Sequence, residues 1–272
     1  MLKVISTHVL LRQRLHPGLL DQLARAGAQG VEIFAARHHF DYTNRQEVRD
    51  LANWFASNPM EPFSMHAPLF PDRDMGRGGA PSVNLLHPEK SRRIDAMDEI
   101  KRALEAAEQI PLRYLNLHLG DRDDTWNARA LEHAITALEH LRAFANPLGV
   151  KLVVENLQNE VTQPLHLKEI LSMGHFKDIG FCFDTGHAHL GAGVAETFSE
   201  MQDLVRTAHI HDNHGEKDEH LWPGEGTIHW DETMQLLKAA PLAPAGILEV
   251  HYALEEPLET IVEKAQQAFE KF

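Results

Sequence analysis

The feature that most constrains the fold is an eightfold alternation of short apolar segments with longer amphipathic ones. The short segments are rich in Val, Ile, Leu and Phe, as buried strands are. They span residues 3–6, 30–34, 62–66, 112–118, 149–155, 179–184, 204–210 and 246–249. The longer segments have helical periodicity and span residues 17–26, 45–56, 88–109, 128–145, 165–173, 196–204, a stretch beginning near 230, and 258–269.

Strands that alternate with helices imply a parallel sheet, and eight such units predict a closed (β/α)8 TIM barrel of the α/β class. A doubly wound open sheet is the alternative, but it usually carries a glycine-rich phosphate loop after its first strand. The sequence there is Ser6-Thr7-His8-Val9, which contains no glycine. No linker or break in composition separates the units, so we expect a single domain over residues 1–272.

Composition limits the partners and the compartment. The formal net charge is −14, which disfavours nucleic acid and anionic membranes as partners. The basic run at residues 90–102 is interleaved with acidic residues and is typical of a solvated helix face. Cys182 is the only cysteine, and no apolar run could span a bilayer, so we expect a cytoplasmic protein without disulfides. The sequence does not indicate an oligomeric state.

Six successive predicted strands end in a side chain that can bind a metal. In a barrel of this kind the carboxyl ends of the strands form one mouth, so these side chains should meet there. They are His66, His118, Glu155, Asp184, His209 or His211, and Glu249. His187 follows an expected tight turn at residues 185–186, and the loop after the seventh strand adds Asp218 and His220.

Electrostatics favours a cation at this mouth. Four carboxylates converging on a partly dry cavity would repel one another unless some were protonated or a multivalent ion neutralised them. Neutral imidazoles beside them favour the ion, and mixed N and O ligands suit Zn, Mn, Co or Fe, with Mg possible if few imidazoles bind. Taken alone, residues 208–226 could also be a polar, His-rich surface loop.

The chain resembles the xylose isomerase-like barrel superfamily, specifically its sugar phosphate isomerase/epimerase group, which also contains the metal-dependent abasic-site endonucleases. Nearly the whole chain takes part in the likeness. The matching segments are Gly30-Val31-Glu32-Ile33, Met65-His66-Ala67-Pro68, Leu117-His118-Leu119-Gly120, Val154-Glu155-Asn156, Phe183-Asp184-Thr185-Gly186-His187, His209-Ile210-His211-Asp212, Pro223-Gly224-Glu225-Gly226 and Leu248-Glu249.

The resemblance implies that one divalent ion is held by Glu155, Asp184, His209 and Glu249, with His211 as a possible substitute or neighbour. In such isomerases the two glutamates commonly also move protons. The endonucleases hold a three-zinc cluster with further ligands. Those positions match His66, His118, His187, Asp218 and His220, so the resemblance allows one to three ions.

The favoured hypothesis is a metal-dependent isomerase or epimerase of a sugar or sugar phosphate that works through an enediolate. Glu155 and Glu249 are the candidate base and acid, while His187 and His211 could orient or protonate substrate oxygens. The leading alternative is a multinuclear zinc phosphodiesterase acting on DNA, which the ligand set permits and the charge disfavours. A non-catalytic metal-binding or sugar-binding barrel is a third possibility.

Overall fold

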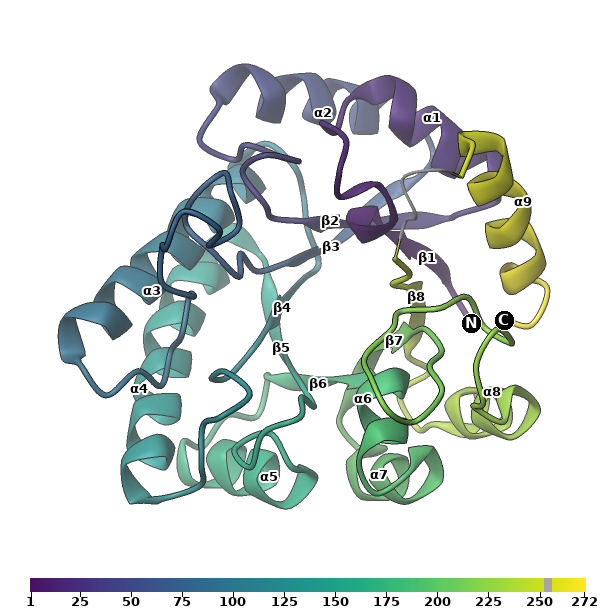
Figure 1. The fold of residues 1–272 in the computed structure, drawn as a ribbon. Helices are drawn as coiled ribbons and strands as arrows, with labels where there is room; N and C mark the ends of the chain where they lie inside the picture. The colour runs from purple at the N-terminus through teal and green to yellow at the C-terminus, as the bar shows by residue number, and fades with distance from the viewer. Residues whose placement is uncertain (252–255) are drawn as a thin grey trace.

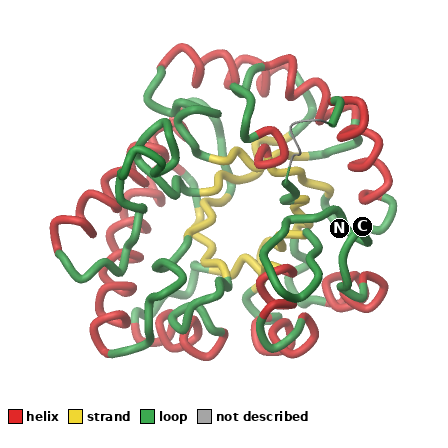
Figure 2. Tube along the Cα trace, in the orientation of Figure 1, coloured by secondary structure: helices red, strands yellow, loops and turns green. Residues whose placement is uncertain are grey.

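Eight parallel strands form a closed barrel that is surrounded by helices (Figures 1 and 2). The computed structural model describes residues 1–251 and 256–272. The strands are β1 (Lys3–Ser6), β2 (Gly30–Phe34), β3 (Glu61–His66), β4 (Tyr114–Leu117), β5 (Lys151–Glu155), β6 (Gly180–Asp184), β7 (Val205–Ile210) and β8 (Ala245–Leu248). Each strand pairs with its neighbour in sequence, and β1 pairs with β8 to close the ring. The predicted (β/α)8 fold is therefore confirmed.

The helices between the strands cover the outside of the barrel (Figure 2). They are α1 (Pro17–Arg25), α2 (Arg45–Ser57), α3 (Lys90–Leu104), α4 (Ala128–Ala145), α5 (Pro164–Met173), α6 (Thr185–Leu190), α7 (Val194–Met201), α8 (Trp230–Ala239) and α9 (Leu258–Phe269). Polar caps begin several of them: the side chain of Asn127, for example, accepts hydrogen bonds from two backbone amides of the first turn of α4. Their apolar faces pack on the strands, so the main core lies between the barrel and the helices.

The structure corrects several boundaries in the sequence prediction. The tight turn expected at residues 185–186 is the first turn of α6, because the Asp184 side chain caps that helix by accepting from the His187 amide at 2.7 Å. The helix expected over 196–204 is α7, which ends at Met201, where the chain turns into β7. The helix expected to reach residue 109 ends as α3 at Leu104 and continues as a 3-10 turn.

One expected solvated face is also partly buried. Glu99, on the basic run of α3, is 4% exposed and accepts a hydrogen bond from the Tyr42 hydroxyl at 2.5 Å. Arg102 forms an ion pair with the same carboxylate. This part of the helix therefore joins α3 to the loop before α2.

The single cysteine, Cys182, is buried in β6, and burial raises the pKa of its thiol to about 12. Within the described ranges, every helix is too short or too polar to cross a bilayer.

Candidate metal centre

The side chains predicted at the strand ends all lie at the same end of the barrel. His66 is the last residue of β3, and His118 follows β4 directly. Glu155 and Asp184 end β5 and β6, and Glu249 follows β8. The side chains at the centre of this set are almost fully buried: Asp184 and His209 are 0% exposed, Glu155 is 1% and Glu249 is 3% exposed.

Glu155, Asp184, His209 and Glu249 surround one point, and the distances from His209 Nδ1 describe it. His209 Nδ1 lies 3.0 Å from a Glu249 oxygen, 3.3 Å from Glu155 Oε2 and 3.7 Å from Asp184 Oδ2. Despite these short distances, the nitrogen is buried without an aligned hydrogen bond. This nitrogen and the three carboxylates therefore converge on a common point, as ligands of an ion do.

A carboxylate from β2 touches the other side of the same imidazole. Glu32 Oε1 lies 3.2 Å from His209 Nε2, and both residues are 0% exposed. The Ser64 hydroxyl donates to the second Glu32 oxygen at 2.8 Å, which holds the carboxylate in place. An acidic neighbour favours the proton on Nε2, which leaves Nδ1 free for the centre.

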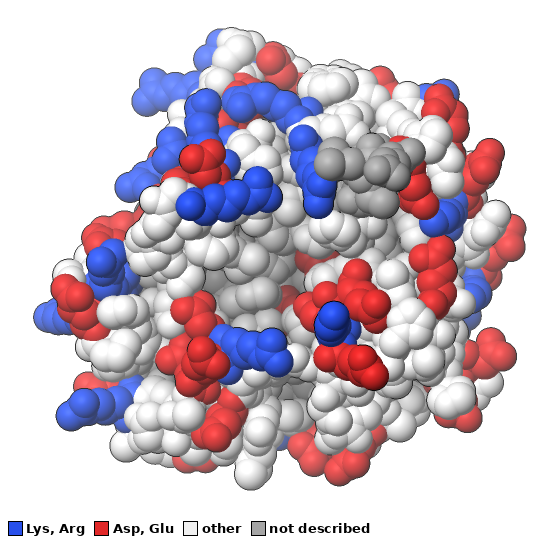
Figure 3. Space-filling model, viewed as in Figure 1, with Lys and Arg blue, Asp and Glu red and all other residues white. Residues whose placement is uncertain are grey.

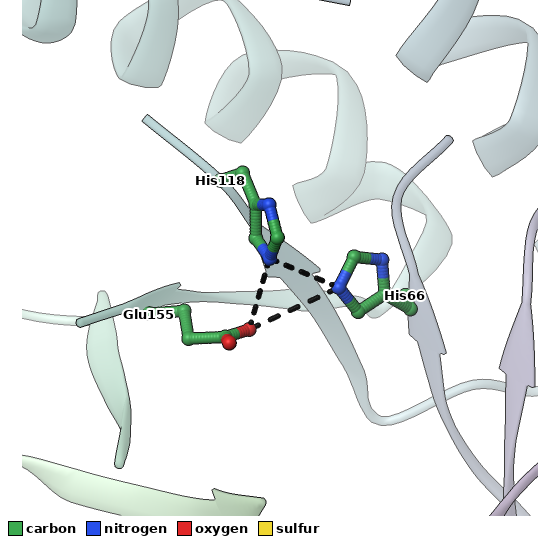
Figure 4. A group of neighbouring side chains, drawn as sticks. All are labelled: His66, His118 and Glu155. Atoms are coloured by element: carbon green, nitrogen blue, oxygen red, sulfur yellow. Dashed lines mark hydrogen bonds and ion pairs between the residues drawn. The ribbon is translucent and has the colours of Figure 1, made fainter. Parts of the chain in front are cut away.

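A second group lies beside the first and shares Glu155 with it (Figure 4). His66 Nε2 and His118 Nε2 are 3.2 Å apart, and they lie 3.9 and 3.3 Å from Glu155 Oε2. His66 Nδ1 donates to the Ala67 carbonyl at 2.8 Å, so its Nε2 carries the lone pair that faces the group.

A third group combines His187 of α6 with two residues of the loop that follows β7. Asp218 Oδ2 is 3.2 Å from the Nε2 atoms of both His187 and His220. The Nδ1 of His220 donates to the Glu249 carbonyl at 2.8 Å, which fixes its tautomer. His220 adopts a φ of 49°, a conformation that non-glycine residues rarely hold unless their surroundings enforce it.

His211 lies fully buried between Asp184 and His220. Its side chain is 0% exposed, its Nε2 lies 3.0 Å from Asp184 Oδ2, and its ring stacks on His220 at 3.9 Å. It also belongs to a possible ligand group with Asp218 and His220. In this position the His211 imidazole contacts the Asp184 carboxylate and can fix its orientation.

The electrostatics of the centre favours a positive charge there. Burial alone would lower the pKa of His187, yet Asp184, Asp218 and Glu155 raise it well above its ordinary value. Burial alone would likewise raise the pKa of Glu249, yet His209 holds it well below the usual range. Protons thus balance the buried carboxylates where a divalent cation could do so instead, so the residues present fit such an ion.

The structure brings together every predicted ligand, and it adds residues that the sequence analysis did not select. Asn116, in β4, donates to Glu155 Oε2, and Ser64 supports Glu32. The sequence did contain a signal for these residues, namely a polar residue within an apolar strand, because a buried polar group needs a partner. The two cases are Gly30-Val31-Glu32-Ile33 and Tyr114-Leu115-Asn116-Leu117.

The relatives of this chain include nucleases, isomerases and proteins of unstated activity. It is 30% identical to protein MJ1311 of Methanocaldococcus jannaschii over 55% of this chain, and it spans only 54% of that relative. It is 27% identical to a probable endonuclease 4 of Haloarcula marismortui, over 70% of this chain and 69% of that protein. It is 21% identical to an inosose isomerase of Halalkalibacterium halodurans, over 89% and 86%.

Solved structures share the fold over almost the full chain. A D-tagatose 3-epimerase-like protein superposes with a TM-score of 0.80 at 23% identity, covering 99% of this chain and 95% of that one. The IolI protein with a bound zinc atom gives 0.81 at 17% identity, covering 99% and 96%. At these identities the likeness shows the fold alone. The profile of the xylose isomerase-like TIM barrel family matches residues 20–272, and the chain belongs to that family.

Proposed function

We propose that this protein is a divalent-metal-dependent isomerase or epimerase of a sugar or sugar derivative. One observation carries the proposal: Glu155 from β5 and Glu249 from β8 both reach His209 Nδ1, at 3.3 and 3.0 Å. Two carboxylates on well-separated strands could then lie on different sides of a substrate carbon. The fold shared with a D-tagatose 3-epimerase-like protein and the inosose isomerase relative support the same class of reaction.

Glu155, Asp184, His209 and Glu249 would hold the ion. When bound, it would supply a Lewis acid for a carbonyl and its adjacent hydroxyl and would stabilise the negative charge of an enediolate. The pKa values of Glu155 and Glu249 lie below the ordinary range, because neighbouring imidazoles outweigh the opposing effect of burial. Both carboxylates are therefore ionised at neutral pH, as a base that takes a proton from carbon must be.

The remaining residues position these groups. His187 keeps 11% of its side chain exposed, so it can contact a substrate oxygen, whereas His211 supports Asp184 from a fully buried position. Asn116 donates to Glu155 and restricts the rotation of that carboxylate. These contacts hold the candidate base and acid in fixed places before substrate arrives.

Exchange of a substrate C–H proton with deuterium oxide tests the proposal. Zinc- or manganese-loaded protein should exchange one carbon-bound proton of at least one sugar in a panel of aldoses, ketoses, inososes and their phosphates. Glu155→Gln and Glu249→Gln should each lower the exchange rate by about 10²- to 10⁴-fold. Metal content measured on each variant separates loss of the base from loss of the ion. Glu216→Gln, on an exposed loop residue, is the control, and a panel with no exchange at all would refute the proposal.

A second candidate function is hydrolysis of a phosphodiester by several ions. The observation that favours it is a pair of flanking ligand groups, His66–His118 and His187–Asp218–His220. A single ion is enough for proton transfer in a sugar, so that reaction does not require these two groups. Adjacent ions could activate water and bind a phosphate. The relatives named probable endonuclease 4 are consistent with it.

Charge argues against this second candidate. The net charge is −14, which disfavours a polyanion such as DNA, and in Figure 3 basic side chains gather only along the upper rim of the mouth while acidic ones gather along its lower rim. Elemental analysis of protein purified without chelator separates the two functions. Three tightly bound zinc ions per chain, together with cleavage of DNA that contains abasic sites, would favour the hydrolase.

A further inference from the structure

A large cavity opens beside the candidate metal centre. Its volume is about 800 Å³, and it lies between the loops that follow β4 and β5, helix α6 with the loop after it, and helix α7. A smaller hollow of about 300 Å³ shares Leu157, Asn159 and His187 with it and extends to His118 and Asp218. His187 of the third ligand group therefore lines the cavity itself, and the neighbouring hollow reaches His118 and Asp218, so a molecule bound at the centre could extend towards this space.

The cavity is larger than the reaction at the metal centre requires. Ligand pockets in proteins commonly enclose about 300 to 1,000 Å³ for a molecule of drug size. A single sugar ring with its reacting carbons beside Glu155 and Glu249 would leave most of this space to water. The volume therefore fits a substrate with a second group joined to the reacting sugar.

Charge on the walls restricts what that second group can be. Among the described residues, Arg122 is the one Lys or Arg side chain that lines the cavity, beside the imidazole of His187 and against five carboxylates. These are Asp123, Asp124, Glu160, Glu196 and Glu200. Two of the five are already used by the fold, since Asp124 accepts from Asn84 and Glu160 accepts from the Trp126 amide. A phosphate placed here would be repelled.

The remaining walls suit a polyhydroxylated group. Glu196 and Glu200 are exposed and lie one turn apart on α7, where their oxygens can accept hydrogen bonds from hydroxyls. Leu157 and Leu190 line the cavity as well, and Leu165 joins them with 68% of its surface exposed. Hydroxyl groups and the apolar faces of a sugar ring would match acceptors and leucines on the same wall.

We propose that this cavity is a subsite for an uncharged glycosyl or polyol group, so that the substrate is a glycoside or oligosaccharide. The proposal rests on the proposed isomerase or epimerase function and narrows its substrate class. It places the reacting sugar at Glu155 and Glu249, with the second sugar between α7 and the loops after β4 and β5. Phosphate esters fit this subsite poorly.

Matched substrates in the deuterium-exchange assay test the subsite. The pairs are D-glucose with maltose and cellobiose, and D-fructose with isomaltulose, each compared with the corresponding 6-phosphate. We expect at least one disaccharide to show a kcat/KM for exchange at least 10-fold above its parent sugar, and the phosphates to show no gain. Ala192→Trp, which fills the cavity from the loop between α6 and α7, should bring this ratio close to one.

A matched pair of double variants tests the role of the wall carboxylates. Glu196→Gln with Glu200→Gln should lower the disaccharide-to-parent ratio by at least 3-fold, because two charged acceptors are lost. Glu259→Gln with Glu263→Gln removes the same charge from exposed positions one turn apart on α9 and should leave the ratio unchanged. Thermal unfolding of each variant confirms that it is folded.

The outcomes separate this inference from the proposed function. Exchange of monosaccharides without any gain from a second sugar, or with a gain from phosphate, would overturn the subsite and leave the function standing. Absence of exchange with every sugar would overturn the function. In that case saturation-transfer NMR with maltose, cellobiose and isomaltulose decides the subsite, since binding that is absent or insensitive to Ala192→Trp contradicts it.

Discussion

Glu155 has contacts with all of the candidate ligand groups. Its Oε2 faces His209, His118 and His66, while its Oε1 lies 3.3 Å from His187 Nδ1. A carboxylate with two differently directed oxygens can serve two neighbouring positive centres at once. The buried position, at 1% exposure, makes this arrangement costly without a counter-charge, which protonated His187 and His209 or a bound ion can supply.

Among residues that are not themselves ligands, Glu32 should have the largest effect on the metal affinity of the centre. Glu32→Gln removes the negative charge that lies 3.2 Å from His209 Nε2 and favours the proton on that nitrogen. We expect metal affinity to fall by about 10- to 100-fold, as it does when comparable supporting carboxylates are lost. Competition with a chromophoric chelator measures the affinity, and the absorption spectrum of the cobalt-loaded protein reports the ligand geometry.

Glu61→Gln is the matched control for this variant. Glu61 also lies on a barrel strand, but it begins β3 at the opposite end from the mouth and binds Arg113 at 2.7 Å. Its replacement should leave metal affinity unchanged. An unaltered affinity in Glu32→Gln would show that His209 is held by packing alone.

His39 makes the stability of the protein depend on pH. It is 0% exposed, its Nδ1 donates to the Gln13 carbonyl at 2.5 Å, and burial lowers its pKa to about 4. Between pH 6.5 and 4 the unfolded chain binds a proton here that the folded chain does not, so stability falls as pH falls through this window. The shift corresponds to a loss of up to about 3 kcal/mol.

His39→Asn keeps a neutral donor and removes the titration. Chemical denaturation at pH 7 and pH 4.5 should therefore show a smaller loss of unfolding free energy in the variant than in the wild type. His16, an exposed residue, provides the control as His16→Asn. Equal losses in wild type and His39→Asn would contradict the assignment.

At the scale of elements, α6 ties the sixth strand to the seventh. It begins immediately after Asp184, whose Oδ1 caps the helix while its Oδ2 faces His211 and His209. Asn213, just beyond β7, donates to the Gly186 carbonyl at 3.0 Å. The first turn of α6 therefore lies directly against the residues that follow β7.

Gly186 allows this close approach. A Cβ at this position would lie 2.0 Å from Cε1 of His211, so Gly186→Ala must displace that imidazole or the helix. We expect a loss of about 1 to 3 kcal/mol in unfolding free energy, typical of overpacking, together with weaker metal binding because His211 supports Asp184. Denaturant unfolding and chelator competition measure the two effects.

Gly78→Ala is the control for Gly186→Ala. The nearest atoms to a Cβ at Gly78 are 3.9 Å away, and its backbone is not in the left-handed region. Stability and affinity should both stay at the wild-type values in this variant. A Gly186→Ala protein with the same properties as wild type would show that His211 can move without consequence.

At the scale of the whole molecule, metal should stabilise the fold, because ligands from strands far apart in sequence meet only when the barrel is closed. An ion that binds only the folded chain adds roughly 4 kcal/mol when its free concentration is about 1,000 times Kd. In a chain of this size this raises Tm by about 10 °C. Calorimetry with zinc or with a chelator measures the difference.

Asp184→Asn is the matched test of this stabilisation. It removes one ligand charge at a fully buried position while keeping the shape of the side chain. The zinc-dependent increase in Tm should therefore be smaller than in the wild type. Equal Tm values with and without metal in the wild type would contradict a buried metal centre.

The alternation of strand and helix could be predicted from the sequence alone, and so could the ligands at the strand ends. Parallel strands place their carboxyl ends on one rim, so knowing which residue ends each strand is enough to place His66, His118, Glu155 and Asp184 together. The residues at which strands and helices begin and end could not all be predicted in this way. Asp184 ends a strand and caps a helix at the same time, and a strand-then-turn pattern does not distinguish that from a loop.

The sequence by itself determined the fold class, the order of the strands and the chemical character of the mouth, because these follow from periodicity and from the direction of parallel strands. Only the tertiary structure decided that Glu32 reaches His209, that His211 lies behind Asp184 and that a cavity adjoins His187. Every residue of β2 and β6 is buried, so hydrophobicity cannot distinguish the inner face of the barrel from the outer one. The register shift between Val31 and Glu32, which places Glu32 beside Ser64, is set by contacts between strands and leaves no mark in local sequence.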